Sequence, residues 1–286
     1  MLGLLIDRFR ASRVQSRSRY AAARRQIPKE LFAHWKRTAP AEFPAIPVSA
    51  YFYASATEGL LSFFECAARS PNACALPSKA ADSVWHAWSR YSQSGLDAFC
   101  KRQFGKVIPH VEAGAMAGDM DLALATCLAQ ARKQSKLSTA SPTVPMLFAL
   151  DKRLKMPGGY AYRVDNGKVG FMHMDGRGAP AGPMNYPSSL DLDGLLAAGL
   201  VSAGAYAFYM RQQGRKPDPS TAGASCGSDC GSACASGGDG GDSGERSGSD
   251  GSACSSASSA SSDSGGGSSC SSGSSCGSSC SSSSGD

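Results

Sequence analysis

The chain has 286 residues, and its composition changes abruptly near residue 220. From there to the end it consists almost entirely of Ser, Gly, Ala, Asp and Cys, without aromatic residues, Leu, Ile, Val or Met. Such a segment cannot bury enough apolar surface to offset its conformational entropy, so we expect a disordered tail over 216–286. The preceding part is long enough for one domain with its own core.

The net charge of the chain also changes near residue 220. From residue 220 on, seven acidic residues against Arg246 alone give a net charge of −6, and because the whole chain carries +6, the part before residue 220 carries +12. Much of that excess precedes Gln26, and this basic segment predicts weak contact with an anionic surface or nucleic acid, or attraction to the tail. The arginines concerned are Arg8, Arg10, Arg13, Arg17, Arg19, Arg24 and Arg25.

The N-terminal segment, 1–27, is expected to be a basic amphipathic helix over 2–25. Leu2, Leu5, Ile6 and Phe9 are spaced to lie on one side of it. No basic region precedes this apolar run, which argues against a secretory signal, although the Arg- and Ser-rich start also resembles a mitochondrial presequence. We therefore expect a cytoplasmic protein whose body cysteines are reduced and packed in the core.

The body, 28–175, shows helical spacing in most of its length. A short helix is predicted from Ile27 through Trp35, ending before Pro40. A second begins at the Ser-x-x-Glu capping box of 55–58 and ends at Pro71.

A third helix is predicted to begin at Ser78, which can cap it. Ala81, Val84, Trp85 and Trp88 form one apolar stripe on it. Gly95 is expected to separate this helix from another over 96–104, which ends at Gly105. Further helices are expected from Asp119 or Asp121 through Ala129, and over 146–154 behind Pro145.

The pattern then changes to alternation, which predicts a hairpin over 160–174. Asn166-Gly167 lies between the two alternating runs, and a type I′ turn needs positive φ at both central residues. Residues 176–187 are expected to be loop. The fold class is therefore mainly α: a compact multi-helix domain with a small C-terminal β-hairpin and a disordered low-complexity tail.

Residues 176–215 are expected to contain a loop and an apolar helix over 190–210. The stretch 194–210 is uncharged, and as a helix its seventeen residues would span about 25 Å, slightly short of a bilayer core. Gly199, Ala203 and Ala207 form a ridge suited to helix contacts. We expect a helix packed on the body, with membrane association through 194–210 as the alternative.

One signature stands out: Leu-Pro-Ser, then Asp82, then Trp85-His86, followed by Phe99-Cys100, Phe104-Gly105 and His110. It resembles the bacterial branch of the glycine-rich domain-containing protein-like family over roughly 30–165. The resemblance implies a mainly helical domain without an assigned biochemical role, often followed by a Gly- and Cys-rich tail. The residues of the signature that we expect to be structural are Pro77, Trp85, Trp88, Phe99 and Gly105.

Asp82 and His86 are the candidates for chemistry, because residues four apart share a helical face and a carboxylate can orient an imidazole. An ordinary structural pair is the simpler interpretation, since no activated nucleophile is evident. A metal site, for zinc or another soft metal, would use His86, Cys100 and His110, with Asp82 or His34 as a fourth ligand. Their spacing matches no standard zinc pattern.

The tail carries seven thiols on flexible spacers, so soft-metal capture, intermolecular disulfides and lipidation are all open. The leading hypothesis is a non-enzymatic interaction or scaffold module for an unidentified protein partner. The alternatives are a metal-dependent or acid–base enzyme centred on Asp82 and His86, and a membrane-associated protein. The tail thiols are Cys226, Cys230, Cys234, Cys254, Cys270, Cys276 and Cys280.

Overall fold

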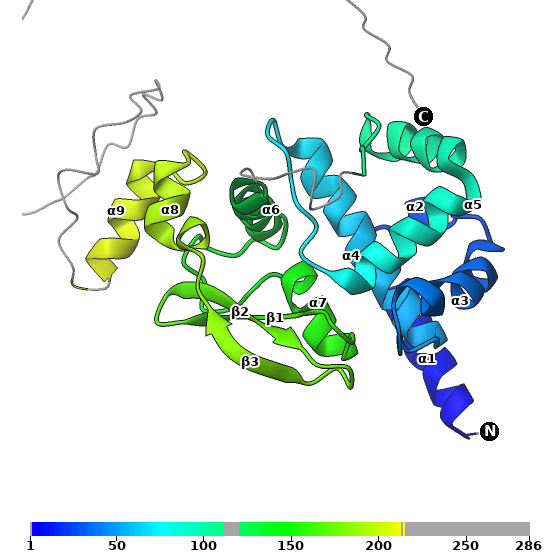
Figure 1. Cartoon of the computed structure of the whole chain (residues 1–286). Coiled ribbons are helices and arrows are strands. Elements are labelled where there is room, and N and C mark those ends of the chain that lie inside the picture. The colour runs from blue at the N-terminus through cyan, green and yellow to red at the C-terminus, as the bar shows by residue number, and fades with distance from the viewer. Residues whose placement is uncertain (1, 111–119, 213, 215–286) are drawn as a thin grey trace, which may run out of the picture. The chain divides into compact units, whose positions relative to one another are not determined.

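A computed structural model describes residues 2–110, 120–212 and 214. This part of the chain is mainly helical, with one three-stranded antiparallel sheet (Figure 1). The predicted fold class is therefore confirmed. The expected tail disorder and the seven tail thiols fall outside the described residues.

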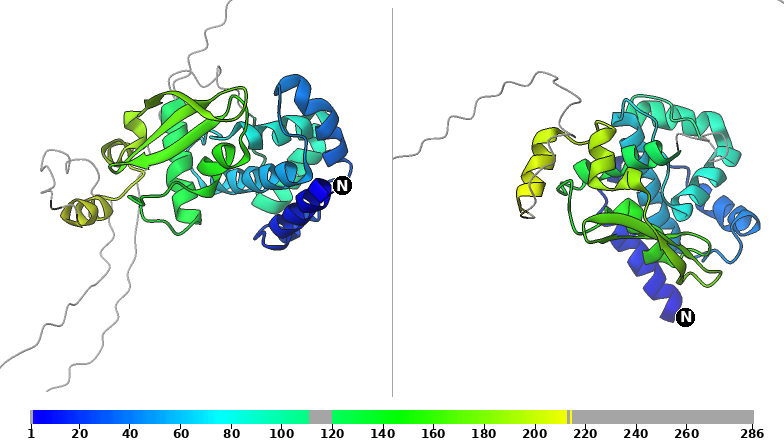
Figure 2. Two further views of the ribbon diagram at one scale, coloured as in Figure 1. Left: turned by 90° about the horizontal axis from the view of Figure 1, so that it is seen from below. Right: turned by 60° about the vertical axis from the view of Figure 1, so that its left-hand side comes forward.

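The N-terminal half is built around one long buried helix, α4, which contacts helices from both halves of the body. Both views of Figure 2 show α1 running beside it. Most side chains of α4 between Phe52 and Cys66 are buried, so this helix forms the centre of the core. The first four helices are α1 (Leu2–Ser16), α2 (Ala21–Arg24), α3 (Leu31–Glu42) and α4 (Ala50–Arg69).

The bounds of α1, α2 and α3 differ from the sequence prediction. The helix expected over 2–25 is divided into α1 and α2. The helix expected to stop before Pro40 continues to Glu42, because in the last turn the missing Pro40 N–H removes a single hydrogen bond and Phe43 N still donates to Ala39 O at 2.8 Å. This extra turn carries Glu42 to the candidate site described below.

The start of α4 lies one and a half turns before the predicted capping box. Ser49 is the N-cap, and its Oγ accepts from Phe52 N at 3.2 Å. Phe52 extends the buried stripe towards the N-terminus, which leaves Ser55 and Glu58 inside the helix. Glu58 instead pairs with Arg24 at 2.8 Å, so the Ser-x-x-Glu pattern is here a coincidence of spacing.

Helix α5 (Lys79–Phe104) begins and ends where the sequence predicts. The Ser78 hydroxyl accepts from Ala81 N at 3.2 Å, and Gly105 closes the helix in the left-handed region at φ 83°. The predicted break at Gly95 lies instead at Ser92, whose backbone is extended (φ −167°, ψ 98°). Ser92 Oγ accepts from Gly95 N at 3.1 Å, so it caps the second half of the helix.

The stripe predicted on α5 is confirmed as core, since Ala81, Val84, Trp85 and Trp88 are all buried. The indole of Trp35, on α3, donates to Ser83 Oγ at 3.1 Å and so fixes α3 against α5. The aromatic core therefore packs α5 from two sides, against α3 and against α4.

The C-terminal half contains the sheet, two helices before it and two after it. Asn166 and Gly167 have φ of 49° and 80°, which confirms the predicted turn and hairpin. A third strand, β3, replaces the loop expected over 176–187. Its prolines are compatible with an edge strand. They also interrupt the alternation of apolar and polar residues by which a strand is predicted from sequence. The elements are α6 (Met120–Gln134), α7 (Met146–Leu154), β1 (Tyr160–Asp165), β2 (Lys168–Met174) and β3 (Pro180–Asn185).

The single apolar helix predicted over 190–210 is wrong. The segment forms a 3-10 turn, η2 (Ser188–Leu190), and two short helices, α8 (Leu192–Ala197) and α9 (Ala203–Gln212). Gly199 at φ 66° breaks the run, and Asp191 caps α8 through Gly194 N at 2.9 Å. Among the helices of the described residues, none has the length and apolarity needed to cross a bilayer.

One buried carboxylate joins the two halves. Asp151, on α7, accepts from Ser78 Oγ at 2.6 Å, Lys79 N at 3.0 Å and Ala80 N at 3.0 Å at the start of α5. It also accepts from Tyr160 N at 3.1 Å at the start of β1. Burial raises the pKa of Asp151, and these hydrogen bonds act in the opposite direction.

Replacing Asp151 should destabilise the fold more than replacing any exposed acidic residue. Asp151→Ala leaves several buried donors without an acceptor, so we expect a loss of about 3 kcal/mol in the free energy of unfolding. The measurement is chemical denaturation of the full chain. Asp121→Asn is the control, because Asp121 is exposed on α6 and should change stability by at most about 0.5 kcal/mol. Equal stability of the two variants would contradict this role.

Candidate metal centre

The site begins with two side chains one turn apart on α5. Asp82 is in the first turn, directly after the residues held by Asp151, and His86 follows four residues later. His86 Nε2 lies 3.5 Å from Asp82 Oδ1. The predicted proximity of the two side chains is therefore confirmed.

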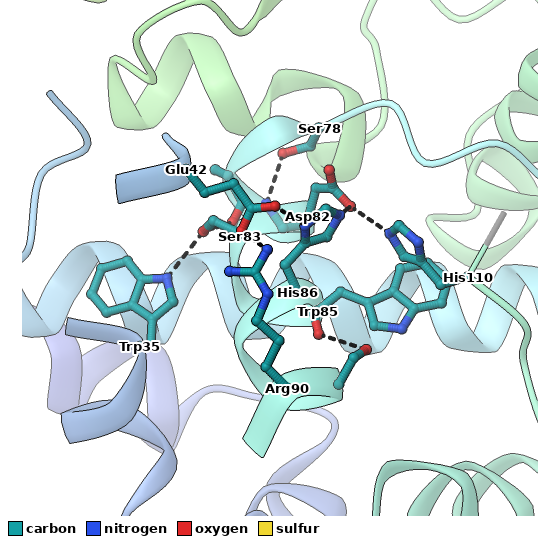
Figure 3. A network of polar contacts seen from close by, with 12 residues as sticks. Trp35, Glu42, Ser78, Asp82, Ser83, Trp85, His86, Arg90 and His110 are labelled. Atoms are coloured by element: carbon teal, nitrogen blue, oxygen red, sulfur yellow. Dashed lines mark hydrogen bonds and ion pairs between the residues drawn. The ribbon is translucent and has the colours of Figure 1, made fainter. Parts of the chain in front are cut away.

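His110 reaches the same carboxylate from the segment that follows α5. Its Nε2 lies 3.1 Å from Asp82 Oδ1, and the ring contacts Trp85 edge to face at a centroid distance of 4.5 Å. Figure 3 shows Asp82 between the two imidazoles, whose centroids are 4.6 Å apart. Gly105 turns the chain after α5 and buried Ile108 anchors it, which places His110 over the helix.

A second carboxylate holds His86 from the opposite side. Glu42 Oε1 accepts from His86 Nδ1, and Glu42 Oε2 is paired with Arg90 Nη2 at 2.7 Å (Figure 3). With Nδ1 donating to Glu42, the Nε2 of a neutral His86 keeps its lone pair facing Asp82. No motif of the sequence pointed to Glu42. The buried spacing of Leu31, Trp35 and Ala39 would have placed it on the inner face of a longer α3.

The ligand atoms of Asp82, His86 and His110 all lie within 4.8 Å of one another. Two ligand atoms about 2.1 Å from one ion, at octahedral or tetrahedral angles, are separated by about 3.0–3.4 Å. The distances of 3.1 and 3.5 Å to Asp82 Oδ1 are close to this range. Two imidazoles and one carboxylate are also a common ligand set for divalent transition metals.

The cluster opens into a cavity of about 490 Å³. Its three ligand side chains are 21–29% exposed, so they are accessible from the cavity without being fully solvated. Lys79, Lys106 and Tyr160 line the same cavity, together with apolar side chains such as Phe63. A small molecule with a negative charge could therefore approach the cluster.

Cys100, a predicted ligand, is not part of the cluster. Its side chain is buried, and burial together with the charge of Asp97 raises the pKa of the thiol to about 12. A hydrogen bond joins the Cys100 thiol to the backbone of Ile108, so this cysteine supports the segment that carries His110. His34 is also elsewhere, since its ring contacts Tyr91.

The neighbouring hydroxyls are engaged in other contacts. Ser78 Oγ donates to Asp151, and Ser83 Oγ donates to Ala80 O at 2.7 Å. Neither is placed as a nucleophile beside His86, so the arrangement favours metal binding over nucleophilic catalysis.

The fold and the site together define a helical domain that carries a cluster of two histidines and one aspartate in the lining of a cavity. Residues 47–178 match the model of the UCP032817-like family, a name that carries no activity. The matched range contains Asp82, His86, His110 and Asp151, whereas Glu42 precedes it. No curated protein and no solved structure matches the chain significantly.

The four body cysteines are free thiols with different environments. Hydrogen bonding to Cys127 lowers the pKa of half-buried Cys74, with help from Ser70 and Lys106, whereas burial raises the pKa of Cys127. Iodoacetamide at neutral pH should therefore alkylate Cys74 before the other body thiols, because the thiolate is the reactive form. Peptide mapping by mass spectrometry gives the order, with Cys100 as the internal control. Equal rates at Cys74 and Cys100 would show that these environments do not control reactivity.

Proposed function

We propose that this domain binds one divalent transition metal through Asp82, His86 and His110 and uses it to activate water for hydrolysis. The observation that carries the proposal is the convergence of these three side chains, from two segments, in the lining of one cavity. Three protein ligands leave coordination positions open for water and substrate, as catalytic sites require.

The surroundings of His86 support the proposal. A metal-bound histidine usually donates its other ring N–H to a carboxylate, which fixes its tautomer and orientation. Glu42 accepts from His86 in this way, and Arg90 holds Glu42 in place. A divalent metal held by Asp82, His86 and His110 would supply a Lewis acid that lowers the pKa of bound water and polarises an oxygen of the substrate. The chain itself supplies the ligands, their orientation and a cavity that limits access of bulk water.

The cavity also favours a class of substrate. Lys79 and Lys106 add positive charge to its lining, so an anionic ester such as a phosphate ester fits better than a neutral one. The Lys79 ammonium lies 5.7 Å from the centre of the Tyr160 ring, which limits its range of positions.

The likeness to the glycine-rich domain-containing protein-like family is consistent with this proposal, because Asp82 and His86 lie within the signature that carries it and His110 follows it. The scaffold hypothesis differs from ours in one respect: it requires no ion at these residues. Metal binding therefore distinguishes the two.

The first test is a Co²⁺ and Zn²⁺ titration of the full chain after its reactive thiols have been alkylated. We expect one equivalent to bind, and Asp82→Ala, His86→Ala or His110→Ala to weaken binding at least about 100-fold. His173→Ala is the control, because His173 lies on β2 outside the cluster. Circular dichroism checks that each variant is folded. Less than a tenth of an equivalent bound, or wild-type affinity in the three variants, would overturn the proposal.

Removing the carboxylate behind His86 should weaken the site without abolishing it. Glu42→Ala is expected to lower metal affinity about 10–100-fold at unchanged stoichiometry, because His86 loses the acceptor of its Nδ1–H. Glu30→Ala is the matched control, an exposed glutamate at the other end of α3. Unchanged affinity in Glu42→Ala would mean that Glu42 does not support a ligand.

The hydrolytic step has its own test. The metal-loaded full chain is assayed with p-nitrophenyl phosphate and bis-p-nitrophenyl phosphate, with p-nitrophenyl acetate as the neutral comparison. We expect metal-dependent turnover of a phosphate ester that is lost in Asp82→Ala and kept in His173→Ala. Metal binding without turnover of any of these esters would overturn the proposed hydrolysis, and the cluster would then be a metal-binding site without this activity.

A further inference from the structure

The apolar side chains of α1 face solvent, contrary to the usual orientation of a surface helix. Leu5 is 62% exposed, Ile6 43% and Phe9 63%, whereas Ala11 on the side towards the body is only 6% exposed. Leu5, Ile6 and Phe9 share one face of the helix, and Leu4, on another face, is 71% exposed. A helix that exposes leucine and phenylalanine while burying alanine is oriented for an external partner.

A specific interaction holds α1 in this orientation. The carboxylate of Asp7 accepts from Ala50 N at 2.8 Å and from Tyr51 N at 3.2 Å, at the positive end of α4. Asp7 is the only acidic residue before Glu30. The contact that docks α1 on α4 therefore engages its one carboxylate and turns Leu5, Ile6 and Phe9 outwards.

Cations surround the exposed apolar residues. Arg8, Arg10 and Arg17 are exposed, and within the described residues none of them is paired with a carboxylate. Arg13 lies 5.8 Å from the centre of the Phe9 ring. A neighbouring groove of about 660 Å³, between α1, α2 and α4, adds Arg25. Positive charge and apolar surface are thus combined on one exposed element.

We propose that α1 docks the protein on an anionic lipid bilayer. Leu5, Ile6 and Phe9 enter the boundary between headgroups and acyl chains, and the arginines contact lipid phosphates. The 15 residues of α1 would extend only about 22 Å, and they contain arginines, so the helix lies on the membrane without spanning it.

A lipid surface fits both properties of α1 better than the other anionic partners. A nucleic acid would engage the arginines and leave Leu5 and Ile6 in water. The acidic tail of the chain has no leucine, isoleucine, valine, methionine or aromatic residue with which to cover them. The proposal is independent of the metal centre, since it uses none of its residues.

The test is co-sedimentation of the full chain with vesicles of phosphatidylcholine alone or with one third phosphatidylglycerol. We expect binding to the anionic vesicles that falls as salt is added. Phe9→Ser and the pair Arg8→Gln with Arg10→Gln should each weaken it about ten-fold. Phe208→Ser is the matched control, because Phe208 on α9 is also 63% exposed.

Thermal unfolding confirms that each variant keeps the fold. Lack of wild-type binding to anionic vesicles, or equal losses in Phe9→Ser and Phe208→Ser, would overturn the proposal. Retention of a single-stranded RNA without retention of vesicles would assign the arginines to nucleic acid and also overturn it.

Discussion

The arrangement of this molecule depends on the buried carboxylate of Asp151. Its four hydrogen bonds join the first turn of α5 to α7 and to the start of β1. Space for it is made by Gly159, where a Cβ would lie 2.5 Å from Asp151 Oδ2. Because Asp82 follows directly in α5, the position of the candidate metal ligand is fixed by a residue far away in the sequence. The same hydrogen bonds place the sheet beside the cavity.

The proposed metal centre is thus assembled from elements that the core holds rigidly. Trp35 bonds to Ser83 and ties α3 to α5, which brings Glu42 to His86. Gly105 and the support of Cys100 bring His110 back over α5. Only His110 comes from an irregular segment, so it is the ligand whose position depends least on helix packing.

Local patterns predicted a large part of this fold. The capping serine at 78, the apolar stripe with Trp85 and the Asn166-Gly167 turn all rest on short-range rules, and these were confirmed. The errors arose where distant contacts decide: Pro40 is tolerated at the end of α3, and Gly199 breaks a run that composition alone made continuous.

Asp82 and His86 were found from their spacing on one helix. Glu42 could not be assigned to the site from the sequence, because the predicted α3 ended before Pro40. Cys100 was included because it is close to His110 in the sequence, but closeness in the sequence does not determine the direction in which a side chain points.

The proposed site would hold its ion through two imidazoles and a carboxylate, with no role for thiols. X-ray absorption spectroscopy of the full chain carrying one equivalent of Zn²⁺ tests this most directly, because sulfur and nitrogen or oxygen ligands differ in distance by about 0.2–0.3 Å. Binding by Asp82, His86 and His110 should give a shell of nitrogen and oxygen at about 2.0–2.1 Å with the outer scattering of two imidazoles. A shell dominated by sulfur at about 2.3 Å would contradict it and would place the metal on the cysteines.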